Sequence, residues 1–294
     1  MQILRTVAEL RRWSRSIRNH AGASGLDSET RESAVRIGLV PTMGALHAGH
    51  ASLIRAARAA CTHVAVSLFV NPTQFGPNED YARYPRTFEA DCALAKSEGA
   101  GVLFAPAVEE LYPNGPDSAF VEVPGLSQRL DGASRPGHFR GVATVVAKLF
   151  IAAEPDLAFF GQKDAAQVAL LRRMVADLRF AVEIVVCPIV RDPDGLALSS
   201  RNAYLTPAQR AQALTLSRAV RHVESLVAEG ERRAETLLAA ARGLFAAVPE
   251  IRIDYIALVD WATLEPVETA APGALFAVAA WVGSTRLIDN TILT

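Results

Sequence analysis

The chain has 294 residues, half of them hydrophobic, and its formal net charge is −1. A chain of this length buries a large core, and typical domain sizes favour two domains over one. The near-zero charge, with arginines scattered among acidic residues, excludes the basic surface of a nucleic-acid-binding protein and favours a small-molecule ligand.

The sequence also predicts a protein outside membranes and oxidising compartments. It has no apolar run of about 18 residues, and the first five residues lack the apolar core of a signal peptide. The cysteines Cys61, Cys92 and Cys187 are odd in number and have neither C-x-x-C nor zinc-ligand spacing. We therefore expect a cytoplasmic protein with reduced cysteines and no nucleic-acid or membrane partner.

Along the first two thirds of the chain, apolar runs alternate with helical patterns. This alternation predicts a parallel sheet flanked by helices, and such sheets bind ligands beyond the carboxyl ends of their strands. A small, polar segment at 20–30 is predicted to be a flexible surface loop. The predicted strands are 35–40, 64–70, 101–105, 119–123, 157–160 and 182–186, and the predicted helices are 51–58, 87–98 and 142–153.

The pattern changes near Pro188, which we take as a domain boundary between residues 1–188 and 189–294. Two amphipathic helices follow, with Thr206 as N-cap and Pro207 as the first helical residue of the first. Three short strands then predict a small antiparallel sheet. The helices are expected at 207–229 and 233–245, and the strands at 251–259, 275–280 and 285–289.

The most informative motif, PTMGALHAGH at 41–50, joins the first buried strand to the next helix. At a helix N-terminus, unpaired N–H groups and the helix dipole favour anions, and an imidazole adds a hydrogen bond or positive charge. His47 and His50 are three residues apart, so both would face one phosphate, while Gly49 keeps the backbone open to a ligand. A metal-binding pair or two surface histidines is the alternative for an isolated H-x-x-H.

The next strand end, FVNPTQFGP at 69–77, carries two amide side chains. Gln74 offers a donor and an acceptor to a substrate hydroxyl or carboxylate, whereas Asn71 before a proline also fits an ordinary turn. Farther along, Glu89 and Asp91 begin the helix at 87–98. They would hold magnesium through water or cap the first helical turn.

Two further motifs place cations before predicted helices. RPGHFRG at 135–141 can clamp an anion, with a solvated turn as the alternative. GQKDAAQ at 161–167 follows an apolar strand, so Lys163 can place its point charge on a phosphate. Asp164 would cap the helix or bind a ribose hydroxyl, and Gln167 lies one turn later on the same face.

The last motif, DGLALSSRN at 194–202, is a loop with two hydroxyls and an arginine. Ser199, Ser200 and Arg201 can wrap a triphosphate by hydrogen bonds and charge, although alone they fit an ordinary loop. A mobile second domain would bring them over His47 and His50 as a lid.

Together, five blocks resemble the pantothenate synthetase family, within the nucleotidyltransferase superfamily that carries the H-x-G-H signature. In family order they are PTMGALHAGH, FVNPTQFGPNEDYARYPRT, RPGHFRGVATVVAKLF, GQKDAAQ and DGLALSSRN. The resemblance implies a Rossmann-like N-terminal domain, a smaller α+β C-terminal lid and a homodimer. It also implies ATP-dependent condensation of pantoate with β-alanine to pantothenate, AMP and pyrophosphate, through a pantoyl adenylate and with Mg²⁺.

The resemblance assigns roles to residues that match the family motifs. His47 and His50 would contact ATP phosphates, with His50 as the proton donor, and Asp91 would contact magnesium. Lys163, Ser199, Ser200 and Arg201 would hold phosphate oxygens, and Lys163 and Arg201 join the histidines as catalytic residues. The nucleotide site would also include Met43, Gly44, Gly161, Asp164, Val190 and Leu198, and the pantoate site Gln74 and Gln167 with Arg135 and His138 in support.

The chain departs from the commoner family pattern in three places. Gln162 and Ala165-Ala166 replace Glu and Tyr-Gln, Leu198 replaces Met, and the loop before the strand at 35–40 is long. Two other functions stay open at this point. A simple nucleotidyltransferase would leave its product as a nucleotide adduct, and a catalytically silent regulator would only bind the nucleotide.

Overall fold

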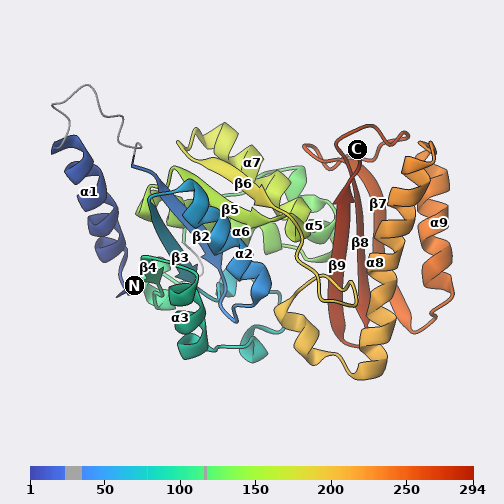
Figure 1. Ribbon diagram of the computed structural model, residues 1–294, viewed down its shortest axis with the longest axis horizontal. Helices are drawn as coiled ribbons and strands as arrows, with labels where there is room; N and C mark the ends of the chain where they lie inside the picture. Colours follow the sequence, from blue (N-terminus) through green and yellow to red (C-terminus); the bar gives the residue numbers. More distant parts are fainter. Residues whose placement is uncertain (24–34, 78, 116–117) are drawn as a thin grey trace.

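A six-stranded, fully parallel sheet forms the N-terminal part of the protein (Figure 1). The structure is a computed structural model that describes residues 1–23, 35–77, 79–115 and 118–294. Counted from the second strand of the chain, the last five strands follow the doubly wound order 3-2-1-4-5, and the first strand is added at one edge. In spatial order the strands are β1 (Gln2–Leu4), β4 (Val102–Phe104), β3 (His63–Leu68), β2 (Ile37–Thr42), β5 (Leu157–Gly161) and β6 (Glu183–Cys187).

Helices cover both faces of this sheet because successive residues of its strands point to opposite faces. Leu39 and Phe160 belong to the core beneath α1, α6 and α7, whereas their neighbours Val40 and Phe159 belong to the core beneath α2 and α3. These helices are α1 (Val7–Ala23), α2 (Ala48–Ala60), α3 (Phe88–Ser97), α6 (His138–Ala153) and α7 (Ala165–Leu178). The short helices are η1 (Pro72–Gln74), η2 (Tyr81–Arg83), α4 (Val108–Leu111), η3 (Leu126–Gln128), α5 (Asp131–Ser134), η4 (Gln162–Asp164) and η5 (Ser200–Tyr204).

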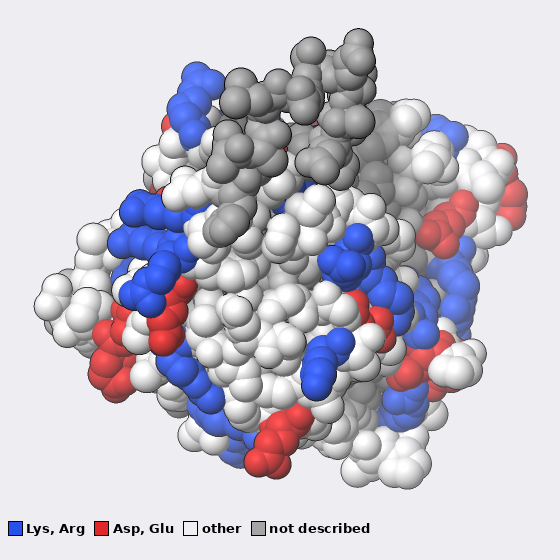
Figure 2. Space-filling view, turned by 60° about the vertical axis from the view of Figure 1, so that its left-hand side comes forward, with Lys and Arg blue, Asp and Glu red and all other residues white. Residues whose placement is uncertain are grey.

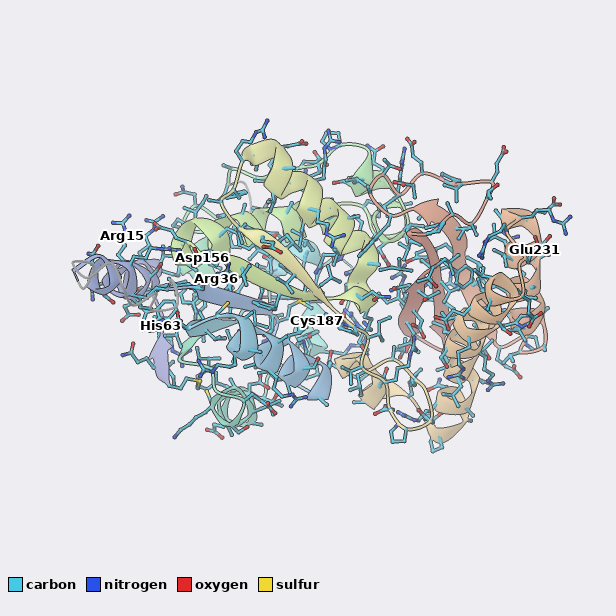
Figure 3. All side chains as sticks on the ribbon, turned by 45° about the horizontal axis from the view of Figure 1, so that its top comes forward. Arg15, Arg36, His63, Asp156, Cys187 and Glu231 are labelled. Carbon is cyan, nitrogen blue, oxygen red and sulfur yellow. The ribbon has the colours of Figure 1, made fainter. Side chains whose placement is uncertain are left out.

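The chain leaves the parallel sheet at Cys187, which Figure 3 labels at the passage to the C-terminal part. There a three-stranded antiparallel sheet packs one face against α8 and α9. Residues Val259, Leu275 and Ala277 of the sheet join the core beneath α6 and α7 instead. The elements are α8 (Pro207–Ala228), α9 (Ala234–Ala246), β7 (Ile251–Asp260), β8 (Ala274–Val282) and β9 (Thr285–Ile292).

The fold confirms the predicted parallel α/β part and the antiparallel C-terminal sheet, corrects three local predictions and adds two elements. No strand forms at 119–123, where the Val121 N–H donates to Thr144 Oγ1 of α6 instead of to a neighbouring strand. The predicted loop at 20–30 is helical up to Ala23, and its remainder lies outside the described residues. The helix predicted at 142–153 begins at His138, and β1 and α1 were not predicted at all.

On the face shown in Figure 2, acidic and basic side chains are interspersed rather than separated by sign. Among the described helices, none combines the length and the apolar character needed to cross a membrane.

Candidate active site

The candidate site lies where the strand order reverses, beside the carboxyl ends of β2 and β5. Strands β3 and β5 lie on opposite sides of β2. The segments that follow β2 and β5 therefore lie on the two sides of a crevice. The motif at 41–50 follows β2, and Lys163 follows β5. Figure 3 labels Arg36, His63 and Asp156 at the opposite, amino ends of β2, β3 and β5, which shows how far these residues lie from the motif loops.

The two histidines cap α2. His47 is the N-cap residue, and its Nδ1 accepts a hydrogen bond from the Gly49 N–H at 3.1 Å. His50, three residues later, returns the interaction, because its Nδ1 accepts the His47 N–H at 3.3 Å. Since each Nδ1 is an acceptor, each Nε2 carries the ring proton and remains a donor.

Both imidazoles are neutral at physiological pH. Burial lowers the pKa of His47 to about 4, and the positive charge of Lys163 adds to this effect. Burial also lowers the pKa of His50 to about 3, assisted by His47 and Lys163. The ring centroids lie 4.2 Å apart. The pair therefore offers two hydrogen-bond donors instead of the positive charge that was one of the two options in the sequence analysis.

The turn before the histidines depends on a buried carboxylate. Asp91 of α3 accepts the N–H groups of Ala45 and Leu46 at 2.9 and 2.8 Å, and it also accepts the Thr87 hydroxyl. Gly44 lies against the same carboxylate and does not line the clefts described below. Both oxygens of Asp91 are thus used by the turn, which argues against the predicted magnesium contact.

Gly49 lines the nucleotide cleft described below, in line with the prediction, and it has a second role. A Cβ atom at this position would lie 2.9 Å from Cε1 of His47, closer than real side chains approach. The glycine therefore makes room for the His47 ring, rather than only keeping the backbone open to a ligand.

One cleft holds nearly all of the residues predicted to bind the nucleotide. Its empty volume, including the space open to solvent, is about 730 Å³. Segments from both parts of the chain enclose it, because the loop after β6 lies over the histidine turn. Of the predicted residues, it is lined by Met43, His47, His50, Gly161, Lys163, Asp164, Val190, Leu198, Ser199, Ser200 and Arg201.

A second cleft, of about 900 Å³, holds the residues predicted to bind pantoate. Val142, Val145 and Leu149 of α6 give it an apolar wall. This wall is well suited to a branched aliphatic acid. The predicted residues lining this cleft are Gln74, Arg135, His138 and Gln167.

The two clefts adjoin. They share lining residues, so a ligand in one cleft can contact a ligand in the other. The shared residues are Met43, His50, Tyr84, Asp164 and Arg201.

Gln74 is held by a buried network. Asn71, which is 1% exposed, donates to Gln74 Oε1 at 3.2 Å and to the Gly141 carbonyl at 3.0 Å. Gly141 allows this contact, since a Cβ there would lie 2.4 Å from the Thr73 carbonyl oxygen. The Gln74 Nε2 donates to Met43 Sδ at 2.7 Å. Asn71 therefore positions Gln74, a role that goes beyond the turn considered in the sequence analysis.

Arg135 and His138 support the backbone at the same position. His138 Nδ1 donates to the Gln74 carbonyl at 2.8 Å, and Arg135 reaches that oxygen at 3.3 Å. Arg135 also makes a bidentate pair with Glu79, with both distances 2.6 Å. Burial lowers the pKa of His138 to about 4, and Arg135 lowers it further.

Two residues that sequence reasoning missed complete the site. Asp80 forms a bidentate ion pair with Arg201, through Nε at 3.0 Å and Nη2 at 2.9 Å. Tyr84 lines both clefts, and its hydroxyl lies 3.3 Å from Ser200 Oγ. Both residues lie within the block at 69–87, but nothing in their spacing distinguishes them from the turn residues around them.

A doubly wound sheet with an H-x-G-H turn at its point of reversal is the arrangement of a nucleotide-binding enzyme. The family model described as pantoate-beta-alanine ligase matches residues 2–292. The chain belongs to the pantoate-β-alanine ligase family, and the resemblance seen in the sequence is confirmed.

Curated relatives and solved structures agree with this assignment. The pantothenate synthetase of Acidobacterium capsulatum is 58% identical over 100% of this chain and 97% of its own length. The crystal structure of pantothenate synthetase from Thermus thermophilus has a TM-score of 0.89 and 46% identity, covering 99% of each chain. The ligase from Francisella tularensis, solved in complex with beta-gamma ATP and beta-alanine, has a TM-score of 0.76 and 34% identity, covering 99% of this chain and 97% of its own. This protein is accordingly an enzyme that ligates pantoate to β-alanine.

Proposed function

We propose that the two adjoining clefts bind ATP and pantoate and form pantoyl adenylate where they meet. The observation that carries this proposal is that His50, Asp164 and Arg201 line both clefts. A carboxylate in the pantoate cleft can therefore approach the α-phosphate of a nucleotide in the other. The ligand-bound ligase of Francisella tularensis, with its ATP compound and β-alanine, supports the choice of substrates.

In the first step, a carboxylate oxygen of pantoate attacks the α-phosphorus of ATP. A new P–O bond forms to the carboxylate, the bond to the β-phosphate breaks, and pyrophosphate leaves with the electron pair. The Nε2–H groups of His47 and His50 donate to phosphate oxygens, while Lys163 and Arg201 balance the charge that develops there. Ser199 and Ser200 donate hydroxyl hydrogen bonds to the phosphates, and Gln74 and Gln167 orient pantoate.

In the second step, the amine of β-alanine attacks the acyl carbon of the adenylate. The C–N bond forms, the acyl C–O bond to phosphate breaks, AMP leaves and the ammonium proton passes to solvent. Because AMP is a good leaving group, the chain needs only to hold the acyl group and admit the amine. Gln74 and the apolar wall formed by α6 keep the pantoyl group in place during both steps.

Magnesium fits this site as a companion of the nucleotide. In proteins Mg²⁺ keeps several waters and is bound by one or two carboxylates together with substrate phosphates. Asp164 is the one carboxylate among the described residues lining the two clefts, and no three potential ligands form a preformed cluster in the described parts of the chain. We therefore assign the protein contact to Asp164 rather than to Asp91. The ion supplies positive charge to the phosphates.

The proposal extends to the assembly and the location of the enzyme. Residues 189–294 form the C-terminal domain, and its segment at 190–201 covers the nucleotide cleft as a lid. The family resemblance supports a homodimer, which light scattering of the purified protein would test. The three free cysteines support a cytoplasmic location, where thiols stay reduced.

The decisive experiment is pantoate-dependent exchange of labelled pyrophosphate into ATP, with magnesium and without an amine. We expect exchange, followed on addition of β-alanine by equal amounts of pantothenate and AMP. Exchange without amide formation would indicate a simple nucleotidyltransferase. ATP binding with neither reaction would indicate a catalytically silent binder.

A further inference from the structure

Strand β9 places two buried polar residues against two separate segments of the nucleotide cleft. Asn290 is 3% exposed, and its Nδ2 donates to the carbonyl oxygens of Gln162 and Lys163 at 3.0 and 2.8 Å. Asp289 is 2% exposed and accepts both terminal nitrogens of Arg191 at 2.6 and 2.9 Å. The two residues are also joined, because the Asn290 N–H donates to Asp289 Oδ1 at 2.8 Å.

The contacts of Asn290 hold the turn that presents Lys163. Lys163 lies in η4, where the chain passes from β5 to α7, and its backbone is fixed by a residue 127 positions away in sequence. Gln162 adds a third contact, since its Nε2 lies 3.4 Å from Asn290 Oδ1. A glutamate, the commoner residue there in the family, has no N–H to donate to this oxygen. Gln162, which departs from the commoner family pattern, therefore has a partner in β9.

The contacts of Asp289 hold the other wall of the cleft. Arg191 pairs with Ala197 across a small antiparallel bridge, and its side chain also donates to the Gly195 carbonyl at 3.2 Å. This hairpin leads directly into Leu198 and Ser199, which line the nucleotide cleft. An arginine fixed by a buried carboxylate at the start of the hairpin determines where its second arm lies.

We propose that Asp289 and Asn290 are positioning residues that together set the separation between Lys163 and the Leu198–Ser199 arm. This inference rests on the proposed function of the cleft. Neither residue lines the nucleotide cleft or the pantoate cleft. They act through Lys163 and Ser199, so their removal alters the geometry in which the phosphates are bound.

A double-mutant cycle between Asn290 and Lys163 tests this role. We expect Asn290→Ala to reduce pyrophosphate exchange about tenfold in the otherwise unchanged enzyme, since small displacements of a phosphate contact are costly. In the Lys163→Ala background, the same substitution should change the rate less than about twofold, because its target is gone. An equal loss in both backgrounds would overturn the proposal, since a merely structural residue acts independently of Lys163. A folded Asn290→Ala variant with unchanged exchange would overturn it as well.

Matched variants keep the test interpretable. Asn290→Ser retains one donor and should recover part of the loss. Thr291→Val replaces the next residue of β9 with one of similar size, and it should leave pyrophosphate exchange unchanged. If Asn290→Ala fails to fold, Asn290→Ser takes its place in the cycle. An equal loss of exchange with and without the Lys163 side chain would then overturn the proposal.

The second half of the proposal is tested in the same way. Asp289→Asn should raise the KM for ATP about threefold, and this effect should disappear in the Ser199→Ala background. Should the wild-type enzyme show no exchange, the proposed function fails, but both cycles can still be measured by calorimetric ATP affinity. If the two substitutions of a cycle then have additive effects on ATP affinity, the positioning roles are overturned separately from the proposed function.

Discussion

The histidine turn at 41–50 and strand β9 meet at the same cleft, but they are built from contacts of very different range. In the turn, the His47 ring accepts the Gly49 N–H and the His50 ring accepts the His47 N–H, so both contacts span at most three residues. In β9, Asn290 and Asp289 bind segments 127 and 98 residues away. The cap of α2 is therefore formed locally, although the turn before it also uses Asp91 of α3. The contribution of β9 exists only after the two sheets have packed together.

Lys163 is where both regions can be disrupted at once, and its removal has the largest expected effect. Its side chain faces the histidines, and its backbone is held by Asn290. We expect Lys163→Ala to reduce pyrophosphate exchange by at least about 100-fold, because a preorganised contact to developing charge is lost. Near-normal exchange by a folded variant would refute this assignment.

Acid should destabilise the histidine turn. The pKa values of His47 and His138 are about 4 and that of His50 is about 3, all below the value of about 6.5 in an unfolded chain. Between these values the unfolded state binds more protons, so stability is complete above pH 6.5 and is lost as the pH falls. Because three histidines contribute, we expect the free energy of unfolding to fall by about 5 kcal/mol between pH 6.5 and 5. Urea denaturation at both pH values measures it, and His138→Gln should reduce the slope.

Replacing His50 separates the cap of α2 from catalysis. In α8 a glutamine, Gln209, completes the same type of capping box with Thr206, so His50→Gln should preserve the cap and the melting temperature. It also keeps an N–H donor, and we expect about a tenfold loss of exchange compared with about 100-fold for His50→Ala. Aminolysis of supplied pantoyl adenylate should be less affected in both variants. Equal losses in the two half-reactions would indicate a general structural role.

The smallest expected effects distinguish the two clefts. Asp80 orients Arg201, which lines both clefts and is assigned to the phosphates, whereas the adjacent Glu79 orients Arg135, which lines only the pantoate cleft. Asp80→Asn should raise the KM for ATP about fivefold, and Glu79→Gln should raise the KM for pantoate by a similar factor, since each removes about 1 kcal/mol of orientation. Steady-state kinetics with each substrate varied in turn measures this. Identical changes in both constants for both variants would contradict the assignment.

The range of the contacts explains how much could be predicted from the sequence. The sheet, the capped helices and polar cleft residues such as His47 and Lys163 follow from periodicity, capping residues and motif position, all of which are local signals. The cleft residues Gly161, Val190 and Leu198 were predicted only through the resemblance to the family. Asp80, Tyr84 and Asn290 could not be predicted, because an isolated Asp, Tyr or Asn carries no sign of its distant partner. The prediction of a strand at 119–123 was wrong for the same reason, since Thr144 of α6 provides the hydrogen-bond partner for the Val121 backbone.

The core shared by the two sheets has a thermodynamic consequence. Val259, Leu275 and Ala277 are buried in the same cluster as residues of α6 and α7, although they lie beyond the proposed domain boundary at 188. The C-terminal sheet cannot separate from the N-terminal part without exposing this apolar surface to water. The chain should therefore melt in one cooperative transition, with equal calorimetric and van't Hoff enthalpies. By the same logic, opening of the cleft should be confined to the segment at 190–201.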